Sequence, residues 1–406
     1  EAGHDISAGG LITALLEMCF ADVNLGADID LTCLNEQDIV KALFAENSGV
    51  LLQVNDIAKA DGILREMNIA YHTLGTAEDT AELNITSHDL NFNLSVSDLR
   101  DVWYKTSYLL DRKQSGEEKA LERFKNYKHM PLKFNFPEGF SGQLAAMGLD
   151  PNRKTASGLK AAIIREKGSN SEREMAYALY LAGFDVKDIH MTDLMSGRED
   201  LSDVNFIAAV GGFSNSDVLG SAKGWAGSFK YNDNARNALK NFFDREDTLS
   251  IGICNGCQLF IELGMINPDH KEKPKMLHND SHKFESGFVN VDIPENNSVM
   301  LGTLSGSRLG VWVAHAEGKF NFPYNEDQYQ IVSKFSYKNY PANPNGSDFN
   351  TAAITSNDGR HLVMMPHPER SIFPWNWAHY PENGNKVSPW IEAFVNARKW
   401  VEEKTK

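Results

Sequence analysis

A cysteine in this 406-residue chain stands where an apolar segment meets a helix-forming one. Residues 249–253 predict a buried strand, and residues 258–263 predict a helix. Cys254 follows the strand and lies between Gly252 and Gly256. The dipole and the free N–H groups at a helix N-terminus favour a thiolate, and the two glycines let the backbone approach closely. The pattern favours Cys254 as a nucleophile, although an inert buried cysteine in a strand–helix turn fits it too.

A histidine with a nearby carboxylate is the second group of reactive residues. His367 lies between two prolines in M-M-P-H-P-E, after the predicted strand 361–365, and Glu369 follows two residues later. A cysteine nucleophile needs a histidine as its base, and the histidine needs a carboxylate that fixes its tautomer and orientation. We therefore interpret Cys254, His367 and Glu369 as a catalytic triad. A solvated His-Pro loop is the alternative for H-P-E taken by itself.

The third motif is V-G-G-F-S-N-S-D at 210–217, at the end of the predicted strand 206–210. Glycines after a strand present backbone N–H groups to a ligand without interference from a Cβ atom. The N–H of Gly212 or Phe213, together with that of Asn255, is predicted to form an oxyanion hole. An ordinary glycine turn is the alternative.

Other functions start from the same cysteine. Cys254 and Cys257 form a C-x-x-C pair, which indicates a thiol oxidoreductase but leaves the His367–Glu369 pair without a role. Zinc coordination by both cysteines with His278 and His282 is a weaker alternative, because the sequence between the two ligand pairs is longer than in compact zinc sites. A domain that docks to a partner without catalysing anything is a further alternative.

Strands and helices alternate from residue 159 onward. Such alternation predicts an α/β fold with a parallel, doubly wound sheet, in which functional residues lie at the carboxyl ends of the strands. All three motifs follow predicted strands, so we expect the fold to bring them together. The predicted strands are 159–164, 185–191, 206–210, 249–253 and 361–365, and the predicted helices are 171–181 and 258–263.

The first 157 residues have a different pattern. Residues 1–100 predict a smaller α/β domain, and residues 101–157 are charged and helical at first and then rich in Pro, Gly and Asn, as linkers are. The third predicted part is the α/β domain at 158–406. The elements expected within 1–100 are helices at 11–20 and 56–67, the second capped by Asp56, a buried strand at 49–54, and strands at 68–74 and 81–85.

Composition excludes several classes of protein. The formal net charge of −15 disfavours nucleic-acid binding, and no apolar run is long enough to cross a membrane. Four cysteines do not make a disulfide framework in a chain of this length, so we expect a reducing, cytoplasmic setting. The chain begins inside the glycine-rich motif G-H-D-I-S-A-G-G without an initiator Met, and we expect it to be a piece of a longer protein.

The three motifs together resemble class I, triad-type glutamine amidotransferases, which implies a flavodoxin-like glutaminase domain. The resemblance is closest to the family of large, single-chain phosphoribosylformylglycinamidine synthases. G-H-D-I-S-A-G-G-L resembles the C-terminal lobe of their AIR synthase-related synthetase domain, and W-Y-K-T-S-Y at 103–108 resembles the segment that joins the lobe to the glutaminase. The glutaminase motifs are R-E-K-G-S-N-S-E-R-E-M-A at 165–176, G-G-F-S-N-S-D-V-L-G at 211–220, G-W-A-G-S at 224–228, C-N-G-C-Q at 254–258, H-A-E-G-K at 315–319, Y-P-A-N-P-N-G-S at 340–347 and M-M-P-H-P-E-R at 364–370.

The resemblance implies roles for individual residues and no metal site in the glutaminase. Family members usually have a more basic segment at 278–288, where this chain has His278 and Gly287 in place of expected arginines. The implied roles are Cys254 as nucleophile, His367 as general base, Glu369 as the residue that orients it, and Gln258, His315 and Glu317 as glutamine-binding residues.

The implied activity is that of a glutamine-dependent amidoligase of purine biosynthesis. Glutamine is hydrolysed through a cysteine thioester without a cofactor. The ammonia serves the conversion of formylglycinamide ribonucleotide to the amidine, which needs ATP and Mg²⁺ at a site largely outside this chain. The implied partners are L-glutamine and the N-terminal synthetase domains of the same polypeptide, so this chain by itself is not expected to perform the synthetase step. The turn Gly3–Gly10 could approach a phosphate, but a purely structural turn fits it equally well.

Overall fold

The computed structural model describes residues 1–382 and 384–406, which form two compact units, Glu1–Pro131 and Leu132–Lys406. The predicted linker at 101–157 divides between these units at residue 131. Its later part packs onto the second unit, where Asn135 pairs with Arg308 and the Phe136 ring contacts the core.

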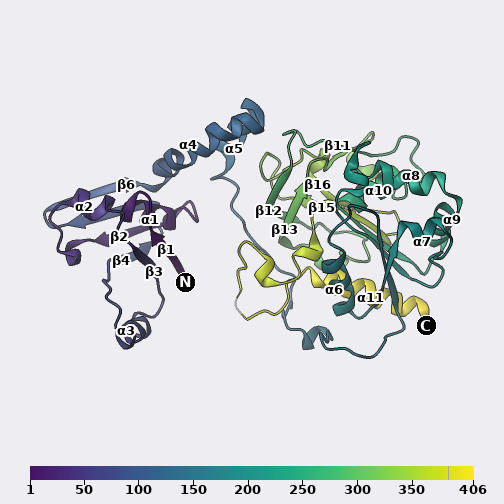
Figure 1. Ribbon diagram of the computed structural model, residues 1–406, viewed down its shortest axis with the longest axis horizontal. Helices are drawn as coiled ribbons and strands as arrows, with labels where there is room; N and C mark the ends of the chain where they lie inside the picture. Colours follow the sequence, from purple (N-terminus) through teal and green to yellow (C-terminus); the bar gives the residue numbers. More distant parts are fainter. Residues whose placement is uncertain (383) are drawn as a thin grey trace. The chain divides into compact units, whose positions relative to one another are not determined.

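The first unit is built on a four-stranded sheet in the order β4-β2-β5-β6, in which only β2 and β5 are parallel. Its core lies between this sheet and α1 and includes Leu11, Leu15, Leu83 and Ile85. A separate antiparallel ribbon is formed by β1 and β3. The elements are β1 (Ala2–Ile6), α1 (Gly10–Cys19), β2 (Gly26–Asp30), α2 (Ile39–Phe44), β3 (Gly49–Gln53), α3 (Ile57–Glu66), β4 (Gly75–Glu78), β5 (Glu82–Ser87), β6 (Leu90–Ser95), α4 (Val96–Gln114) and α5 (Gly116–Asn126) (Figure 1).

The first unit confirms the predicted helices and corrects two predicted strands. Asp56 caps α3 as expected, since its carboxylate accepts a hydrogen bond from the N–H of Lys59. The segment 68–74 is not a strand, because pairing with β2 begins only at Gly75, the first residue of β4. The strand β3 exists but is not buried: Val50 is 64% exposed, because β3 pairs only with β1.

The second unit contains a nine-stranded sheet in the order β13-β12-β15-β16-β17-β10-β9-β7-β8. Its parallel half runs β8-β7-β9-β10-β17, which is the strand order 2-1-3-4-5 of flavodoxin-like folds. This half confirms the predicted doubly wound fold. Its strands are β7 (Lys160–Arg165), β8 (Asp185–His190), β9 (Phe206–Ala209), β10 (Leu249–Ile253) and β17 (His361–Met364).

The other half of the sheet is antiparallel and was not predicted from the sequence. It begins where β16 pairs with β17 and continues through β15 and β12 to β13. β11 and β14 form a separate two-stranded antiparallel ribbon. These strands are β11 (Lys275–Leu277), β12 (Glu285–Asp292), β13 (Arg308–His315), β14 (Lys319–Asn321), β15 (Gln330–Phe335) and β16 (Thr351–Thr355).

Helices cover both faces of the parallel half. In the sheet, β8 lies on one side of β7, whereas β9, β10 and β17 lie on the other side. Because the crossover connections are right-handed, α6 lies on one face of the sheet and the helices that follow β8 and β9 lie on the opposite face. In agreement, α6 packs against α11, while α8 packs against α9 and α10 (Figure 1). The helices are α6 (Glu172–Ala182), α7 (Met191–Met195), α8 (Lys223–Tyr231), α9 (Asp233–Asp244), α10 (Asn255–Glu262) and α11 (Ile391–Thr405).

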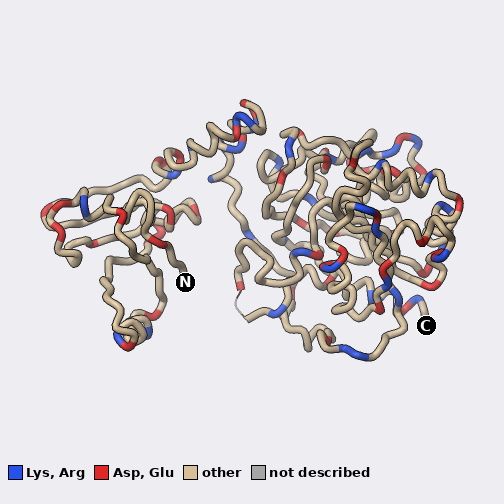
Figure 2. Tube along the Cα trace, viewed as in Figure 1, with Lys and Arg blue, Asp and Glu red and all other residues tan. Residues whose placement is uncertain are grey.

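Basic and acidic residues are interspersed along both units (Figure 2). Within residues 1–382 and 384–406, no helix is both long enough and apolar enough to span a bilayer.

Candidate active site

Cys254 occupies a strained turn between β10 and α10. Its φ of 51° and ψ of −105° are unusual for a residue with a Cβ atom, and such strain persists only where the surroundings enforce it. The N–H of Cys254 donates to the carbonyl of Met364 on the neighbouring strand, and the carbonyl of Cys254 accepts from Gln258 in the first turn of α10. Cys254 lies at the N-terminus of α10, as predicted, but it is only 5% exposed, whereas a nucleophile on such a turn is expected to present an exposed sulfur.

The two flanking glycines are required by close backbone contacts. A Cβ atom on Gly252 would lie 2.6 Å from the carbonyl oxygen of Gly256, and one on Gly256 would lie 2.0 Å from the carbonyl oxygen of Ala209. The first contact closes the turn, and the second presses α10 against β9. The G-x-C-x-G spacing is therefore a packing requirement of the nucleophile turn.

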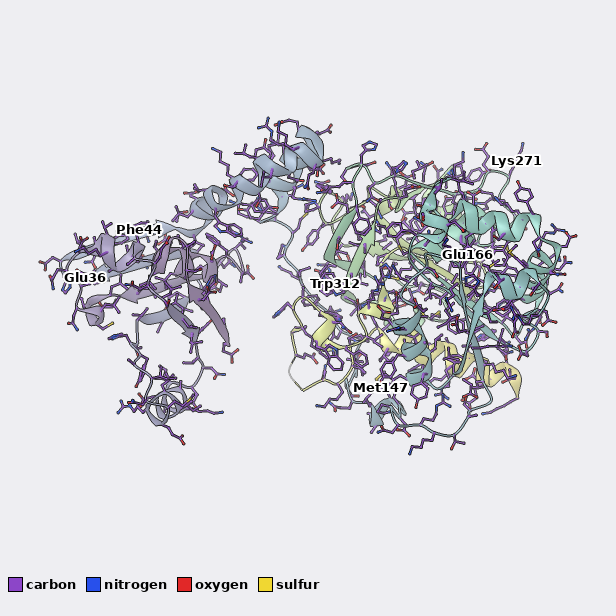
Figure 3. All side chains as sticks on the ribbon, in the orientation of Figure 1. Glu36, Phe44, Met147, Glu166, Lys271 and Trp312 are labelled. Carbon is purple, nitrogen blue, oxygen red and sulfur yellow. The ribbon has the colours of Figure 1, made fainter. Side chains whose placement is uncertain are left out.

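His367 and Glu369 form a buried hydrogen-bonded pair just after β17. Nδ1 of His367 lies 2.7 Å from Oε1 of Glu369, and both side chains are at most 2% exposed. The N–H of His367 donates to the carbonyl of Trp312, a residue of β13 that Figure 3 labels. The antiparallel half of the sheet thus helps to position the histidine. Gly211 lies against the side chains of both His367 and Cys254, since a Cβ there would be 3.0 Å from Cε1 of His367 and 3.5 Å from Cβ of Cys254.

The pair has the electrostatics of an acid–base catalyst. Burial lowers the pKa of His367, but the charge of Glu369 and the Cys254 thiol outweigh it and raise that pKa to about 9. The imidazole is therefore protonated at neutral pH, ready to donate a proton to a leaving group. Cys257 differs from Cys254, because it is fully buried inside α10 and burial raises the pKa of its thiol well above the usual value.

One of the two predicted glycine-loop donors is already engaged. The N–H of Phe213 donates to the carbonyl of Gly168 at 2.9 Å, so it does not point to a ligand. This leaves Gly212 and Asn255 for the predicted oxyanion hole. Gly212 has a φ of 115°, and a Cβ there would lie 2.6 Å from backbone atoms of the adjacent 168–170 segment. Only glycine fits this position.

The three residues implied to bind glutamine lie on two elements that meet near Cys254. Nε2 of Gln258 donates to the carbonyl of Glu317 at 2.6 Å, and the carboxylate of Glu317 accepts from the N–H of Ser221. His315 ends β13 and is buried, and neither of its ring nitrogens has a hydrogen-bond partner among the described residues. Burial, with a smaller contribution from His367, lowers the pKa of His315 to about 3, so its ring stays neutral.

The two departures from the family pattern lie at the edge of this region. The exposed His278 has its Nδ1 3.9 Å from Oε1 of Glu317. Gly287 lies in β12 opposite Val313, and a Cβ there would meet no atom within 4 Å. Across the described part of the chain, no three His, Cys, Asp or Glu side chains are grouped so as to hold a metal ion.

A cavity of about 650 Å³ opens beside His367 and Glu369. Its walls come from α6, from the end of β13 and from residues 372–376, and they include Tyr177, Trp312 and Trp375. No local sequence pattern predicts this cavity, because segments far apart in the chain line it, Ser286 of β12 and residues 367–370 among them. The side chain of Asn255 was also missed as a functional group, since the motif draws attention only to its backbone N–H.

The family model for the CobB/CobQ-like glutamine amidotransferase domain matches residues 158–401. The chain belongs to this family. A second model, for the C-terminal domain of AIR synthase related proteins, matches residues 1–87.

Two curated relatives match almost the whole chain. It is 37% identical to "Probable phosphoribosylformylglycinamidine synthase, chloroplastic/mitochondrial" of Arabidopsis thaliana and 38% identical to "Phosphoribosylformylglycinamidine synthase" of Homo sapiens, over 99% of the chain in each case. The chain spans 30% and 32% of the length of these relatives. Among solved structures, "Structure of PurLQS from Thermotoga maritima" matches 60% of this chain and 99% of its own length, with 22% identity and a TM-score of 0.47.

Proposed function

We propose that residues 158–401 are the glutaminase of a phosphoribosylformylglycinamidine synthase and that they hydrolyse L-glutamine through a thioester on Cys254. The proposal rests on one structural observation above all. Cys254 at the end of β10 and the His367–Glu369 pair after β17 follow adjacent parallel strands, with Gly211 against both. The two synthase relatives, similar over 99% of the chain, support the same conclusion.

In the first half-reaction, the Cys254 sulfur forms a bond to the side-chain amide carbon of glutamine. The carbonyl oxygen becomes an oxyanion, which the N–H groups of Gly212 and Asn255 stabilise. The protonated His367 donates its proton to the amide nitrogen, and the carbon–nitrogen bond breaks. The products are ammonia and a γ-glutamyl thioester, with His367 left neutral.

In the second half-reaction, water replaces ammonia. Neutral His367 takes a proton from the water, whose oxygen forms a bond to the thioester carbon. The carbon–sulfur bond then breaks, which releases glutamate and restores the thiolate and the imidazolium. Glu369 holds the ring in place throughout by its 2.7 Å hydrogen bond.

The amino-acid end of glutamine is proposed to lie by Gln258, His315 and Glu317. Gln258 is in the first turn of α10, four residues after the nucleophile, and its hydrogen bond to the Glu317 carbonyl joins α10 to the loop after β13. The neutral ring of His315 does not compete with His367 for a proton.

The synthetase step is proposed to need more than this chain. The ammonia would serve the ATP- and Mg²⁺-dependent formation of formylglycinamidine ribonucleotide, in a reducing compartment such as the cytoplasm, which suits the four free cysteines. The N-terminus of α1 does not fit a phosphate site. The N–H of Gly9, at the start of α1, donates to the carboxylate of Glu46, which would repel a phosphate, and the described residues hold no metal-binding cluster.

The chloroketone analogue of glutamine tests the proposal. We expect it to alkylate Cys254 alone, as located by mass spectrometry of peptides, and we expect glutamine to protect the cysteine. A wild-type chain in which Cys254 and Cys257 form a reversible disulfide would instead indicate an oxidoreductase. A chain that the reagent leaves unmodified would indicate a docking domain without catalysis.

A second measurement tests the limit of the activity. The chain is expected to release ammonia from glutamine slowly or not at all and to form no amidine with ATP, Mg²⁺ and formylglycinamide ribonucleotide. Formation of formylglycinamidine ribonucleotide by this chain alone would contradict the proposal that the synthetase site lies elsewhere.

A further inference from the structure

The side chain of Asn255 is buried and bonded to three other groups. It is 0% exposed although it directly follows the nucleophile. Its Oδ1 accepts a hydrogen bond from the N–H of Ser214 at 3.0 Å, and its Nδ2 donates to Oε1 of Gln258 at 2.9 Å. The same Nδ2 lies 3.3 and 3.4 Å from the two carboxylate oxygens of Asp217. One amide group thus joins α10 to the loop that follows β9.

That loop is strained over three consecutive residues. Asn215, Ser216 and Asp217 have φ values of 52°, 58° and 47°, in the left-handed region that residues with a Cβ avoid. A strained segment keeps its shape only when several contacts fix it. Besides Asn255, the N–H of Asn215 donates to the carbonyl of Lys167, and the N–H of Ala222 donates to Asp217.

The strained segment begins just after the proposed oxyanion donor Gly212. The other proposed donor is the backbone N–H of Asn255 itself. Because the side chain of Asn255 binds Ser214 and Asp217, one residue supplies a donor and also holds the loop that carries the second donor. The distance between the two donors therefore depends on this side chain.

We propose that the Asn255 side chain is a positioning residue that fixes the 212–217 loop against α10 and so sets the spacing of the two oxyanion donors. This inference rests on the proposed glutaminase function. The chemistry of the site selects asparagine, because the group must accept one hydrogen bond from a backbone N–H and donate others to two oxygen acceptors at once. Aspartate has the same shape but cannot donate, and leucine can do neither.

Asn255→Asp is the direct test. The new carboxylate can still accept from Ser214 but faces the carboxylate of Asp217 and leaves Gln258 without its donor. We expect kcat for glutamine hydrolysis to fall by about 10²-fold, as when one oxyanion donor is lost, and KM to change far less. Asn237→Asp, on the exposed face of α9, adds the same charge without these contacts and serves as the control.

The reciprocal exchange separates positioning from general damage. In Asn255→Asp with Asp217→Asn, the amide and the carboxylate change places, so that a hydrogen bond between them forms again in the opposite direction. We expect this double variant to recover at least about tenfold of the lost kcat. If the effects of the two substitutions on kcat simply add, so that the double variant recovers nothing, the proposal is overturned.

Two alkylating reagents keep the test independent of turnover. Iodoacetamide reports only the nucleophilicity of Cys254, whereas the chloroketone analogue of glutamine also places a carbonyl oxygen in the oxyanion hole. Asn255→Asp should slow alkylation by the chloroketone and leave the rate with iodoacetamide within about twofold. Equal slowing with both reagents, or a wild-type rate with the chloroketone, would overturn the inference. A wild-type chain that the chloroketone does not label would overturn the proposed function instead.

Discussion

Two strand–turn–helix segments rich in glycine, one in each unit, end in very different environments. In the second unit, β10 lies between β9 and β17, is buried along its whole length and leads into Cys254 and α10. In the first unit, β1 pairs only with β3, is largely exposed and leads through Gly9 into α1. This local pattern therefore does not make a reactive site by itself. The neighbouring strands make the site reactive, because they bring in the side chains and backbone groups that complete it.

The groups that surround the two turns explain the difference. At Cys254, the neighbouring strand β17 delivers His367 and Glu369, and β9 delivers the glycine loop. At Gly9, the helix N-terminus meets the carboxylate of Glu46 and the carbonyl of Ser7 accepts from Gly10. Reactive side chains therefore surround the first turn, whereas the backbone N–H groups of Gly9 and Gly10 at the second turn are already hydrogen-bonded within the first unit.

The largest expected effect separates Cys254 from Cys257. Cys254→Ala should abolish glutamine hydrolysis, since it removes the sulfur that forms the proposed thioester, whereas Cys257→Ala should retain a substantial part of the activity because its buried thiol only packs. Ammonia release with glutamine in excess measures both. Equal loss of activity in the two variants would contradict the assignment of the nucleophile.

Glu369→Gln should reduce turnover by about 10²- to 10⁴-fold and change KM much less. The carboxylate acts on His367 and not on the substrate, so its loss removes the correct tautomer without removing a glutamine contact. Steady-state kinetics separate kcat from KM. An increase in KM with an unchanged kcat would assign Glu369 to substrate binding instead.

The pH profile should follow the raised pKa of His367. Because that pKa is about 9, the imidazolium that protonates the leaving nitrogen is present below this pH and is lost as the pH rises through it. We expect kcat/KM to decline above about pH 9, by roughly tenfold per unit. In Glu369→Gln the decline should begin at lower pH, since the charge of Glu369 contributes to the high pKa. An unchanged profile in that variant would contradict the proposed electrostatic role.

Gly10→Ala should affect stability and not catalysis. Gly10 has a φ of 73°, and a Cβ there would lie 2.6 Å from the carbonyl oxygen of Leu43, so we expect the first unit to lose about 2 kcal/mol. Thermal unfolding of the two units and ammonia release measure the two effects. Gly256→Ala is the matched change in the second unit, where the Cβ would press on β9 and both readouts should decline. A loss of kcat in Gly10→Ala would show that the two turns are not independent.

The smallest effect is expected at the exposed ribbon of the first unit. Val50→Thr on β3 replaces a 64% exposed side chain and should change the free energy of unfolding by less than about 0.5 kcal/mol. Denaturant unfolding provides the measurement, with Leu83→Thr in the fully buried strand β5 as the costly counterpart. A loss above 1 kcal/mol for Val50→Thr would mean that the ribbon is covered in solution.

The sequence alone determined the features that depend on near neighbours in the chain. The turn at Cys254 is set by an apolar strand, two glycines and a helix within a few residues, and the His367–Glu369 pair is set by residues two apart. The parallel half of the sheet was predictable for the same reason, since all of its strands except β8 are short, largely apolar runs.

Only the tertiary structure decided which distant groups meet. It added the antiparallel half of the sheet, whose Trp312 carbonyl holds the backbone of His367, and it exposed the apolar β3. In the folded chain the N–H of Phe213 donates to the carbonyl of Gly168. The side chain of Asn255 accepts from the N–H of Ser214, 41 residues away in the sequence. Which groups pair by hydrogen bonds, and which strands are covered, depends on long-range packing among many segments. A local pattern of residue types therefore does not predict it.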